Sequence, residues 1–260
     1  MRIVIIGAGI GGLTLAAGLR RDGHTPVVVE RQSSPSGVGA GLVLHDEALG
    51  ALAAAGVCVT GHRHSGFRIA LADGRVVGRA AGKPGLAISR PALHAALIEA
   101  CEGCAFRLGS ALASVEREPL TVVLDGGERL SADLVVGADG LGSAVREAVG
   151  GTARRRYSGV TCWRGITSVR VDLAGPVEHW ARGFRLGVVP LEDGTYLYLT
   201  RTLAAGGGGR SRRPRYRRPR ALPSLGEPFC RERARCGMAP PRPRRARPPR
   251  AGRGPGGAAG

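Results

Sequence analysis

Four glycines near the start of the chain have the types and spacing of a phosphate-binding turn. Gly7, Gly9 and Gly12 form the pattern G-x-G-x-x-G, which also contains Gly11, directly after the apolar residues 3–6. The first glycine of such a pattern permits a tight turn, the second lets a pyrophosphate approach the backbone, and the third allows a helix to pack closely on a strand. The N-terminus of that helix attracts phosphate charge. The pattern predicts that these glycines bind the pyrophosphate of a dinucleotide.

An acidic residue follows at the place where the adenosine of that ligand would lie. Glu30 ends the apolar run of residues 27–29, 23 positions after Gly7. A carboxylate there can accept hydrogen bonds from both hydroxyls of an adenosine ribose, and it repels a 2′-phosphate, which disfavours NADP at this site. A glycine turn with a purely structural role is the alternative, but the combination of strand, glycines, helix and terminal acid favours a dinucleotide.

The elements that position these residues follow from apolar patterns. Residues 3–6, 27–29 and 134–136 are short apolar runs typical of buried parallel strands. Residues 13–20, between the first two runs, have a helical pattern, which predicts a strand–helix–strand unit with a right-handed crossover. Residues 157–200 are rich in strand-forming residues and indicate a second, sheet-containing region.

A second candidate motif lies at residues 133–146. Asp139 and Gly140 form a sharp turn after an apolar strand, and Ser143 can cap the helix that follows. An Asp-Gly turn before a capped helix is common by itself. Over its whole length, however, the segment closely resembles the Asp-Gly fingerprint of class A flavoprotein monooxygenases, with Arg146 at its last position. In that family the fingerprint lies beside FAD and helps NADH or NADPH to dock.

Further segments resemble the same family in the same order along residues 1–203. By that resemblance, Arg31 follows the adenosine-binding acid and Arg90 lies over the FAD. Leu112 belongs to the strand whose backbone meets the adenine, and residues 38–43 form the loop near the flavin. Arg164 lies in a segment that resembles a strand of the substrate domain and is a candidate substrate-binding residue. The similarity is nearest to the salicylate hydroxylase, urate hydroxylase and zeaxanthin epoxidase type.

The resemblance implies an α/β fold in which a Rossmann-like FAD-binding domain of the p-hydroxybenzoate hydroxylase type, also called GR2, is joined to an incomplete β-sheet substrate domain. It places the FAD-binding domain at residues 1–156, with a substrate-side insertion at about residues 60–90, and the start of the substrate domain at residues 157–203. It also implies that NADH or NADPH reduces FAD, and that the reduced FAD uses oxygen to hydroxylate a small aromatic or related molecule.

No catalytic side chain and no metal site is assigned from the sequence, because in such enzymes the cofactor carries the chemistry. Other FAD enzymes of the same fold, such as reductases and halogenases, stay open as alternatives, since a fold does not determine a function.

Residues 201–260 differ in composition from the rest of the chain. They contain 17 Arg, no Lys and two Glu, and most of the chain's net charge of +18 lies there. Arg, Pro, Gly and Ala make up 47 of these 60 residues, and Val and Ile are absent. Because such a segment has too little apolar surface to offset the entropy lost on ordering, we expect residues 204–260 to be disordered.

This composition is also what a GC-rich gene yields when it is read out of frame. A frameshifted tail is favoured over a selected basic arm, because Lys is absent and prolines are interspersed. A nucleic-acid partner is therefore not expected.

The chain also has no Gly-Asp dipeptide, although the family has a Gly-Asp motif that seats the flavin ring. A non-catalytic flavin-binding fragment or pseudogene product is therefore the alternative to an active monooxygenase.

Two further features have simple interpretations. Cys101 and Cys104 have the spacing of a redox or zinc motif, but they follow a helical pattern and no second pair accompanies them. We interpret them as small apolar residues at a helix–strand junction. No run of residues is long enough to cross a membrane and the N-terminus has no leader pattern, which predicts a cytoplasmic protein without a membrane partner.

Overall fold

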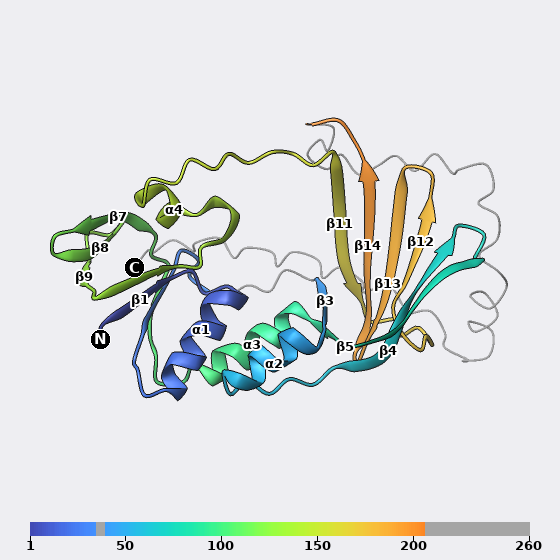
Figure 1. The fold of residues 1–260 in the computed structure, drawn as a ribbon, viewed down its shortest axis with the longest axis horizontal. Helices are drawn as coiled ribbons and strands as arrows, with labels where there is room; N and C mark the ends of the chain where they lie inside the picture. The colour runs from blue at the N-terminus through green and yellow to red at the C-terminus, as the bar shows by residue number, and fades with distance from the viewer. Residues whose placement is uncertain (35–39, 206–260) are drawn as a thin grey trace, which may run out of the picture. The chain divides into compact units, whose positions relative to one another are not determined.

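The computed structural model describes residues 1–34 and 40–205 (Figure 1). Two sequence-based predictions fall partly outside this range: the tail from residue 206 onward, and residues 38 and 39 of the loop expected near the flavin. The chain divides into a unit from Met1 to Arg215 and a unit from Tyr216 to Gly260, and the second lies wholly outside the described residues. The boundary expected at residue 156 stays a prediction.

A four-stranded parallel sheet bears the glycine turn. Its strands are β1 (Ile3–Ile6), β2 (Val27–Glu30), β6 (Ala105–Leu108) and β10 (Leu134–Gly137), in the order β10-β1-β2-β6. All four residues of β1 are buried, because this strand has a neighbour on each side and packed elements on both faces. Helix α1 (Ile10–Arg21) connects β1 to β2 and completes the predicted strand–helix–strand unit.

The two faces of this sheet pack against different elements, because alternate residues of a strand point to opposite sides. Ile3 and Ile5 share a core with α1 and α3 (Arg90–Ala100), which also pack against each other. Val4 and Ile6 share a second core with elements that follow later in the chain. Those elements are β7 (Leu112–Arg117), β8 (Leu120–Leu124), β9 (Arg129–Ser131), which form a three-stranded antiparallel sheet, and α4 (Ala144–Ala148). The expected Rossmann-like α/β fold class is confirmed.

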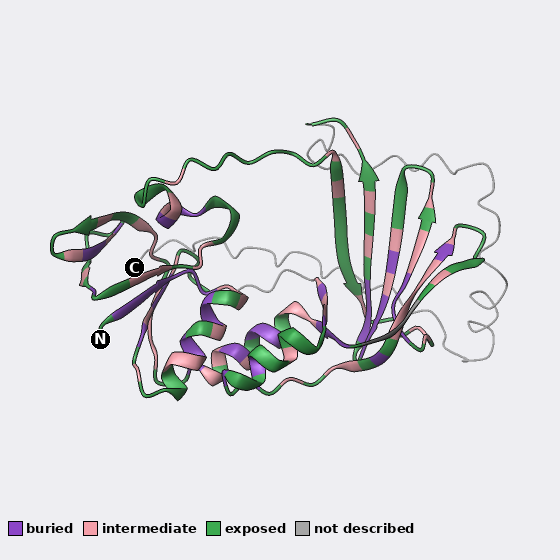
Figure 2. Cartoon of the chain, viewed as in Figure 1, coloured by how far each residue is buried: buried purple, intermediate pink, exposed green. Residues whose placement is uncertain are grey.

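A seven-stranded sheet takes up most of the remaining described residues, in the order β11-β14-β13-β12-β4-β5-β3 (Figure 1). Every pairing in it is antiparallel except that of β12 with β4. Its core is small and contains Ala87, Val189, Leu191 and Tyr196. Figure 2 shows a long exposed stretch along β11, in contrast to β1 of the parallel sheet, which is buried throughout.

The strands of this sheet come from two separate stretches of the sequence. Their bounds, with those of the helix α2 that follows β3, are β3 (Gly41–Leu44), α2 (Asp46–Ala54), β4 (His62–Leu71), β5 (Val76–Ser89), β11 (Val160–Thr167), β12 (Val177–Ala181), β13 (Phe184–Leu191) and β14 (Gly194–Thr202). Residues 41–89 and residues 160–202, which are far apart in the sequence, therefore form one sheet.

Cys101 has the environment of an apolar core residue. It is fully buried at the end of α3, and its Sγ atom donates a hydrogen bond of 3.3 Å to the carbonyl oxygen of Leu13. Burial raises the pKa of the Cys101 thiol to about 12, and burial also raises the pKa of Cys104. A thiol that stays protonated is a poor nucleophile, which agrees with the interpretation of this pair as packing residues.

Within the described part of the chain, no helix combines the length and the apolar character needed to span a bilayer. The same residues contain no cluster of three His, Cys, Asp or Glu side chains that could bind a metal ion.

Candidate functional site

Two of the predicted glycines are required by packing. Gly7 has a φ of +109°, a conformation that favours glycine, and a Cβ atom at this position would lie 2.5 Å from the carbonyl oxygen of Ala138. A Cβ atom at Gly12 would lie 1.9 Å from the carbonyl oxygen of Gly7. Both glycines therefore let the first turn of α1 lie directly against the ends of β1 and β10.

The other two glycines face open space. A Cβ atom at Gly9 or Gly11 would meet no atom within 4 Å. Gly9 precedes the first residue of α1 and has no side chain to cap the helix, and the first turn contains no acidic residue. The first backbone N–H groups of this helix are therefore available to an anion, and the positive end of the helix dipole attracts one. This arrangement fits a pyrophosphate.

The Glu30 carboxylate is held by two backbone N–H groups. Its Oε2 atom accepts a hydrogen bond of 2.9 Å from the N–H of Ala8, and its Oε1 atom accepts one of 3.0 Å from the N–H of Gln32. These bonds tie the end of β2 to the glycine turn and orient the carboxylate. Each oxygen has a second lone pair, so the carboxylate can still accept hydrogen bonds from ribose hydroxyls.

A cavity of about 350 Å³ lies at the carboxyl ends of β1, β2 and β10, where ligands bind in open parallel sheets. Most of the residues predicted to contact a cofactor line it: Gly7, Gly9, Glu30, Arg31, Arg90, Leu112, Asp139 and Gly140. Gly11 and Gly12 do not line the cavity. They belong to the first turn of α1, and Gly12 acts through packing.

The Asp139 carboxylate organises the second predicted turn. Its Oδ1 atom accepts a hydrogen bond of 2.6 Å from the Ser143 hydroxyl, and its Oδ2 atom accepts one of 2.6 Å from the N–H of Ala144. Ser143 Oγ accepts a bond of 3.0 Å from the N–H of Arg146 and caps α4, as predicted. Burial raises the pKa of the Asp139 carboxyl, but these hydrogen bonds outweigh it and lower the pKa below its ordinary value. The ionised carboxylate thus fixes the backbone beside the cavity at Gly140.

His94 is a residue of the site that the sequence did not indicate. It is buried on α3 and lines the cavity. Its Nε2 atom lies 2.8 Å from the carbonyl oxygen of Ala8. Because a carbonyl oxygen only accepts, Nε2 has the proton and donates this hydrogen bond. The one available signal was its position four residues after Arg90, which places both side chains on one face of a helix.

The two predicted arginines lie on different elements. Arg90 begins α3, at a point fixed by the Ser89 hydroxyl, which accepts a hydrogen bond of 3.2 Å from the N–H of Ala92. This helix start places Arg90 at the cavity. Arg164 lies on β11, where its Nε atom is 3.3 Å from the sulfur of Cys162, and it does not line the cavity. Its role in substrate binding stays a prediction.

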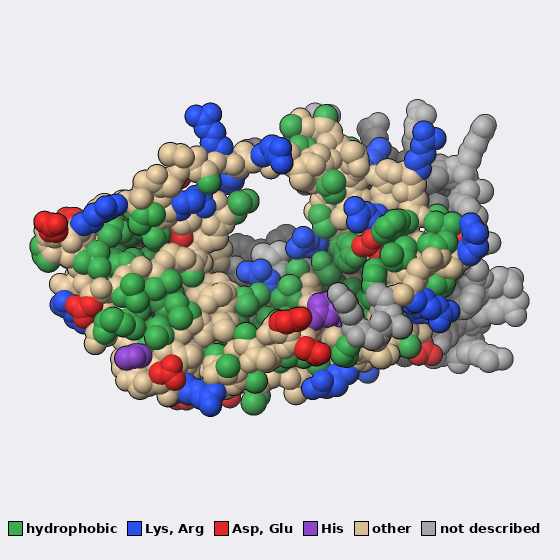
Figure 3. Space-filling view, viewed as in Figure 1, with side chains coloured by type: hydrophobic (Ala, Val, Ile, Leu, Met, Phe, Trp, Pro, Cys, Tyr) green, Lys and Arg blue, Asp and Glu red, His purple; other side chains and the backbone are tan. Residues whose placement is uncertain are grey.

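Positive charge is not gathered into one patch on the face of the molecule shown in Figure 3. There, the Lys and Arg side chains of the described residues are scattered among hydrophobic and acidic ones.

Comparison with known families and proteins agrees with this geometry. Residues 1–215 match the family described as FAD binding domain. The chain is 35% identical over 222 residues to the 2-heptyl-3-hydroxy-4(1H)-quinolone synthase of Pseudomonas aeruginosa, which covers 77% of this chain and 56% of that protein. It is 35% identical over 226 residues to the aurachin C monooxygenase/isomerase of Stigmatella aurantiaca, which covers 80% of this chain and 58% of that protein. The chain spans little more than half the length of these relatives.

Solved structures show the same fold. A variant of HpxO from Klebsiella pneumoniae complexed with FAD is similar with a TM-score of 0.70 at 24% identity, over 79% of this chain and 58% of that one. PqsL from Pseudomonas aeruginosa in complex with 2-aminobenzoylacetate is similar with a TM-score of 0.67 at 22% identity, over 78% of this chain and 61% of that one. At these identities the similarity concerns the fold.

Proposed function

The chain belongs to the FAD-binding domain family of class A flavin monooxygenases, and from that premise we propose that its cavity binds the adenosine diphosphate part of FAD. The observation that carries the proposal is that the cavity contains one group that attracts an anion and another that attracts hydrogen-bond donors. The uncapped N-terminus of α1 beside Gly9 attracts a phosphate, while the Glu30 carboxylate attracts hydroxyl donors. A pyrophosphate joined to a ribose satisfies both features at once.

Each wall of the cavity has one part of this ligand to hold. The backbone N–H groups at the start of α1 would bind the pyrophosphate. Glu30 would accept the ribose hydroxyls, and Arg31 would flank the adenosine. The backbone at residues 110–112, which also lines the cavity, would meet the adenine. The Glu30 carboxylate repels a 2′-phosphate, which favours FAD over NADP at this site.

The residues on the remaining walls would contact the cofactor beyond its pyrophosphate. Arg90 begins α3 and lines the cavity, and so do Asp139 and Gly140. The hydrogen bonds that fix the Asp139 turn and the bond from His94 to Ala8 hold these walls in position. The site is thereby organised before a ligand enters, which reduces the ordering cost of binding.

We further propose that the activity is hydroxylation of a small aromatic or related molecule. Relatives named FAD-dependent urate hydroxylase and 3-hydroxybenzoate 6-hydroxylase support this class of reaction. FAD bound here and reduced by NADH or NADPH would supply the chemistry that activates oxygen, one atom of which would enter the substrate while the other leaves as water. The residues of this chain bind and orient the cofactor. A small-molecule substrate and oxygen are the proposed partners, and the cytoplasm is the proposed location.

Cofactor binding and turnover are tested separately. The full chain, freed of flavin, is titrated with FAD while flavin fluorescence is followed, and saturable binding is expected. Oxidation of NADH and of NADPH is then measured over a panel of aromatic compounds, together with hydroxylated product. Oxidation that depends on the aromatic compound and yields product supports a monooxygenase. Reduction of another acceptor without hydroxylation would instead identify a reductase of the same fold, and failure to bind FAD would contradict the whole proposal.

A further inference from the structure

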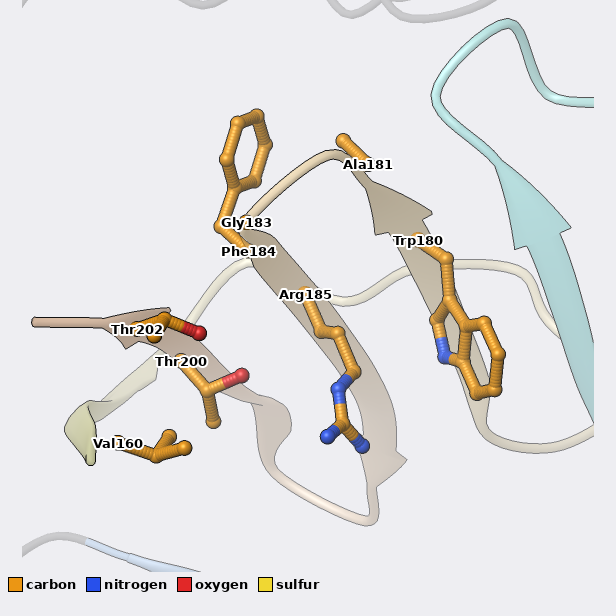
Figure 4. A pocket seen from close by; sticks show the side chains of 8 residues that line it. All are labelled: Val160, Trp180, Ala181, Gly183, Phe184, Arg185, Thr200 and Thr202. Atoms are coloured by element: carbon orange, nitrogen blue, oxygen red, sulfur yellow. The ribbon is translucent and has the colours of Figure 1, made fainter. Parts of the chain in front are cut away.

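A second cavity, of about 200 Å³, lies at one end of the seven-stranded sheet, and we propose that it binds a small aromatic carboxylate (Figure 4). Its main walls are the side chains of Val160, Trp180, Arg185, Thr200 and Thr202, from β11, β12, β13 and β14. None of these residues lines the cavity proposed for FAD. The inference therefore goes beyond the proposed function and can be tested without the cofactor.

The register of three neighbouring strands places the polar residues together. Trp180 on β12 pairs with Arg185 on β13, and Arg185 pairs with Thr200 on β14. Residues directly opposite each other in adjacent strands share one face of a sheet. Figure 4 accordingly shows the Arg185 side chain standing between those of Thr200 and Trp180. A cation, a hydroxyl and an indole thus form one continuous wall.

Arg185 is held in place and still keeps its hydrogen-bond donors. Its guanidinium carbon lies 5.6 Å from the centre of the Trp180 ring, and its Nη1 atom lies 3.7 Å from a carboxylate oxygen of Glu178. The second distance is too long for a hydrogen bond. The side chain is 53% exposed and donates no hydrogen bond within the described residues. Its planar fork of N–H groups is therefore open to a carboxylate, which such a fork binds with two parallel hydrogen bonds.

Glu178 forms an ion pair with Arg185, does not itself line the cavity, and fixes the wall behind Arg185. Its carboxylate accepts a hydrogen bond of 2.5 Å from the Tyr198 hydroxyl and another from the indole Nε1–H of Trp180. Burial and the neighbouring Glu178 raise the pKa of Tyr198, so this hydroxyl stays protonated and remains a donor. The Glu178 side chain is only 13% exposed, so Arg185 is the charged group that faces an entering ligand.

The other walls decide which kind of carboxylate fits. Thr200 and Thr202 offer hydroxyls that form no side-chain hydrogen bond within the described residues, while Val160 and Trp180 offer apolar surface. The volume is below the roughly 300–1,000 Å³ typical of pockets for drug-sized ligands, which favours a ligand with one ring. A benzoate-like molecule combines a carboxylate for Arg185 with a ring for the apolar walls.

Trp180 itself provides the probe. The chain contains two tryptophans, and the other one, Trp163, does not line the cavity, so the full chain with Trp163→Phe reports on Trp180 alone. Benzoate is titrated in the absence of FAD while the fluorescence is followed. We expect saturable quenching by benzoate, and binding at least about tenfold weaker for benzamide, which has the same ring without the charge.

Variants at the arginine complete the test. In the Trp163→Phe background, Arg185→Gln should weaken benzoate binding at least about tenfold, and Arg185→Lys should weaken it less, because it keeps the charge and loses the fork. Arg201→Gln is the matched control, since Arg201 lies between Thr200 and Thr202 in β14 but does not line the cavity. Circular dichroism confirms that each variant is folded. Non-saturable quenching, equal affinity for benzamide, or equal losses in Arg185→Gln and Arg201→Gln would each overturn the proposal.

Discussion

The Nε2 atom of His94 donates a hydrogen bond of 2.8 Å to the carbonyl oxygen of Ala8 and thereby joins α3 to the glycine turn. On its other side, the N–H of Ala8 donates a hydrogen bond to the Glu30 carboxylate at the end of β2. Both backbone groups of Ala8 are thus bound by side chains from separate elements. The backbone that faces the proposed pyrophosphate is held in place by the protein alone.

Replacing His94 tests this brace. His94→Phe should lower the free energy of unfolding by about 1–3 kcal/mol, because the buried carbonyl of Ala8 loses its donor. His94→Gln has an amide N–H at a similar distance from the backbone and should recover part of the loss. Both are measured by urea denaturation without FAD. If the two variants unfold at the same urea concentration, the hydrogen bond to Ala8 does not stabilise the turn.

Replacing Glu30 tests the ribose assignment. Glu30→Ala should weaken FAD binding by about 1–3 kcal/mol, or roughly 5- to 150-fold, because two hydrogen bonds to the ribose are lost. Flavin fluorescence titration of the apo protein measures the effect. Glu99→Ala removes an acid from the exposed side of α3, outside the cavity, and should leave the affinity unchanged. Equal affinity of Glu30→Ala and the parent chain would reject the assignment.

Two alanine substitutions in the glycine turn should have different effects, one on the stability of the fold and the other on FAD binding. Gly12→Ala should destabilise the fold by on the order of 3 kcal/mol, because its Cβ atom would overlap the carbonyl oxygen of Gly7. Gly9→Ala should leave the melting temperature nearly unchanged, because its Cβ atom meets only open space. It should nevertheless weaken FAD binding about tenfold or more, since that space is the proposed pyrophosphate site. Unchanged FAD affinity in Gly9→Ala would move the pyrophosphate elsewhere.

The Asp139 turn should make stability depend on pH. Because folding lowers the pKa of this carboxyl, its stabilising effect is complete above the ordinary pKa of about 3.9 and is lost as the pH falls through the lower folded value. Asp139→Asn should therefore unfold more easily than the parent chain at pH 7, by about 1 kcal/mol, and this difference in stability should close as the pH falls through the lowered pKa of Asp139. Urea denaturation at several pH values measures the difference. Asp172→Asn, at an exposed position, should be as stable as the parent chain at every pH. A loss of stability in Asp139→Asn that does not change with pH would show that the charge of Asp139 does not stabilise the fold.

Much of the fold follows from short-range patterns. The apolar run of β1, the glycines after it and the Ser143 cap of α4 act over a few residues, so local sequence predicts them. The glycine motif itself separates into packing positions and open positions, which is the distinction between Gly12 and Gly9. The order of strands in the sheet could not be predicted from such local patterns. Ile3 of β1 pairs with Leu134 of β10, and no periodicity links residues so far apart.

The sequence by itself predicted where a dinucleotide would meet the backbone, because that chemistry depends on residues adjacent in the chain. Only the tertiary structure showed that His94 supports this turn, since packing of α3 against α1 brings it to Ala8 from 86 positions away. Only the tertiary structure, likewise, placed Arg185 between Trp180 and Thr200. That grouping depends on the pairing of three strands, and a shift of one residue in the register of β13 would have turned Arg185 to the opposite face of the sheet.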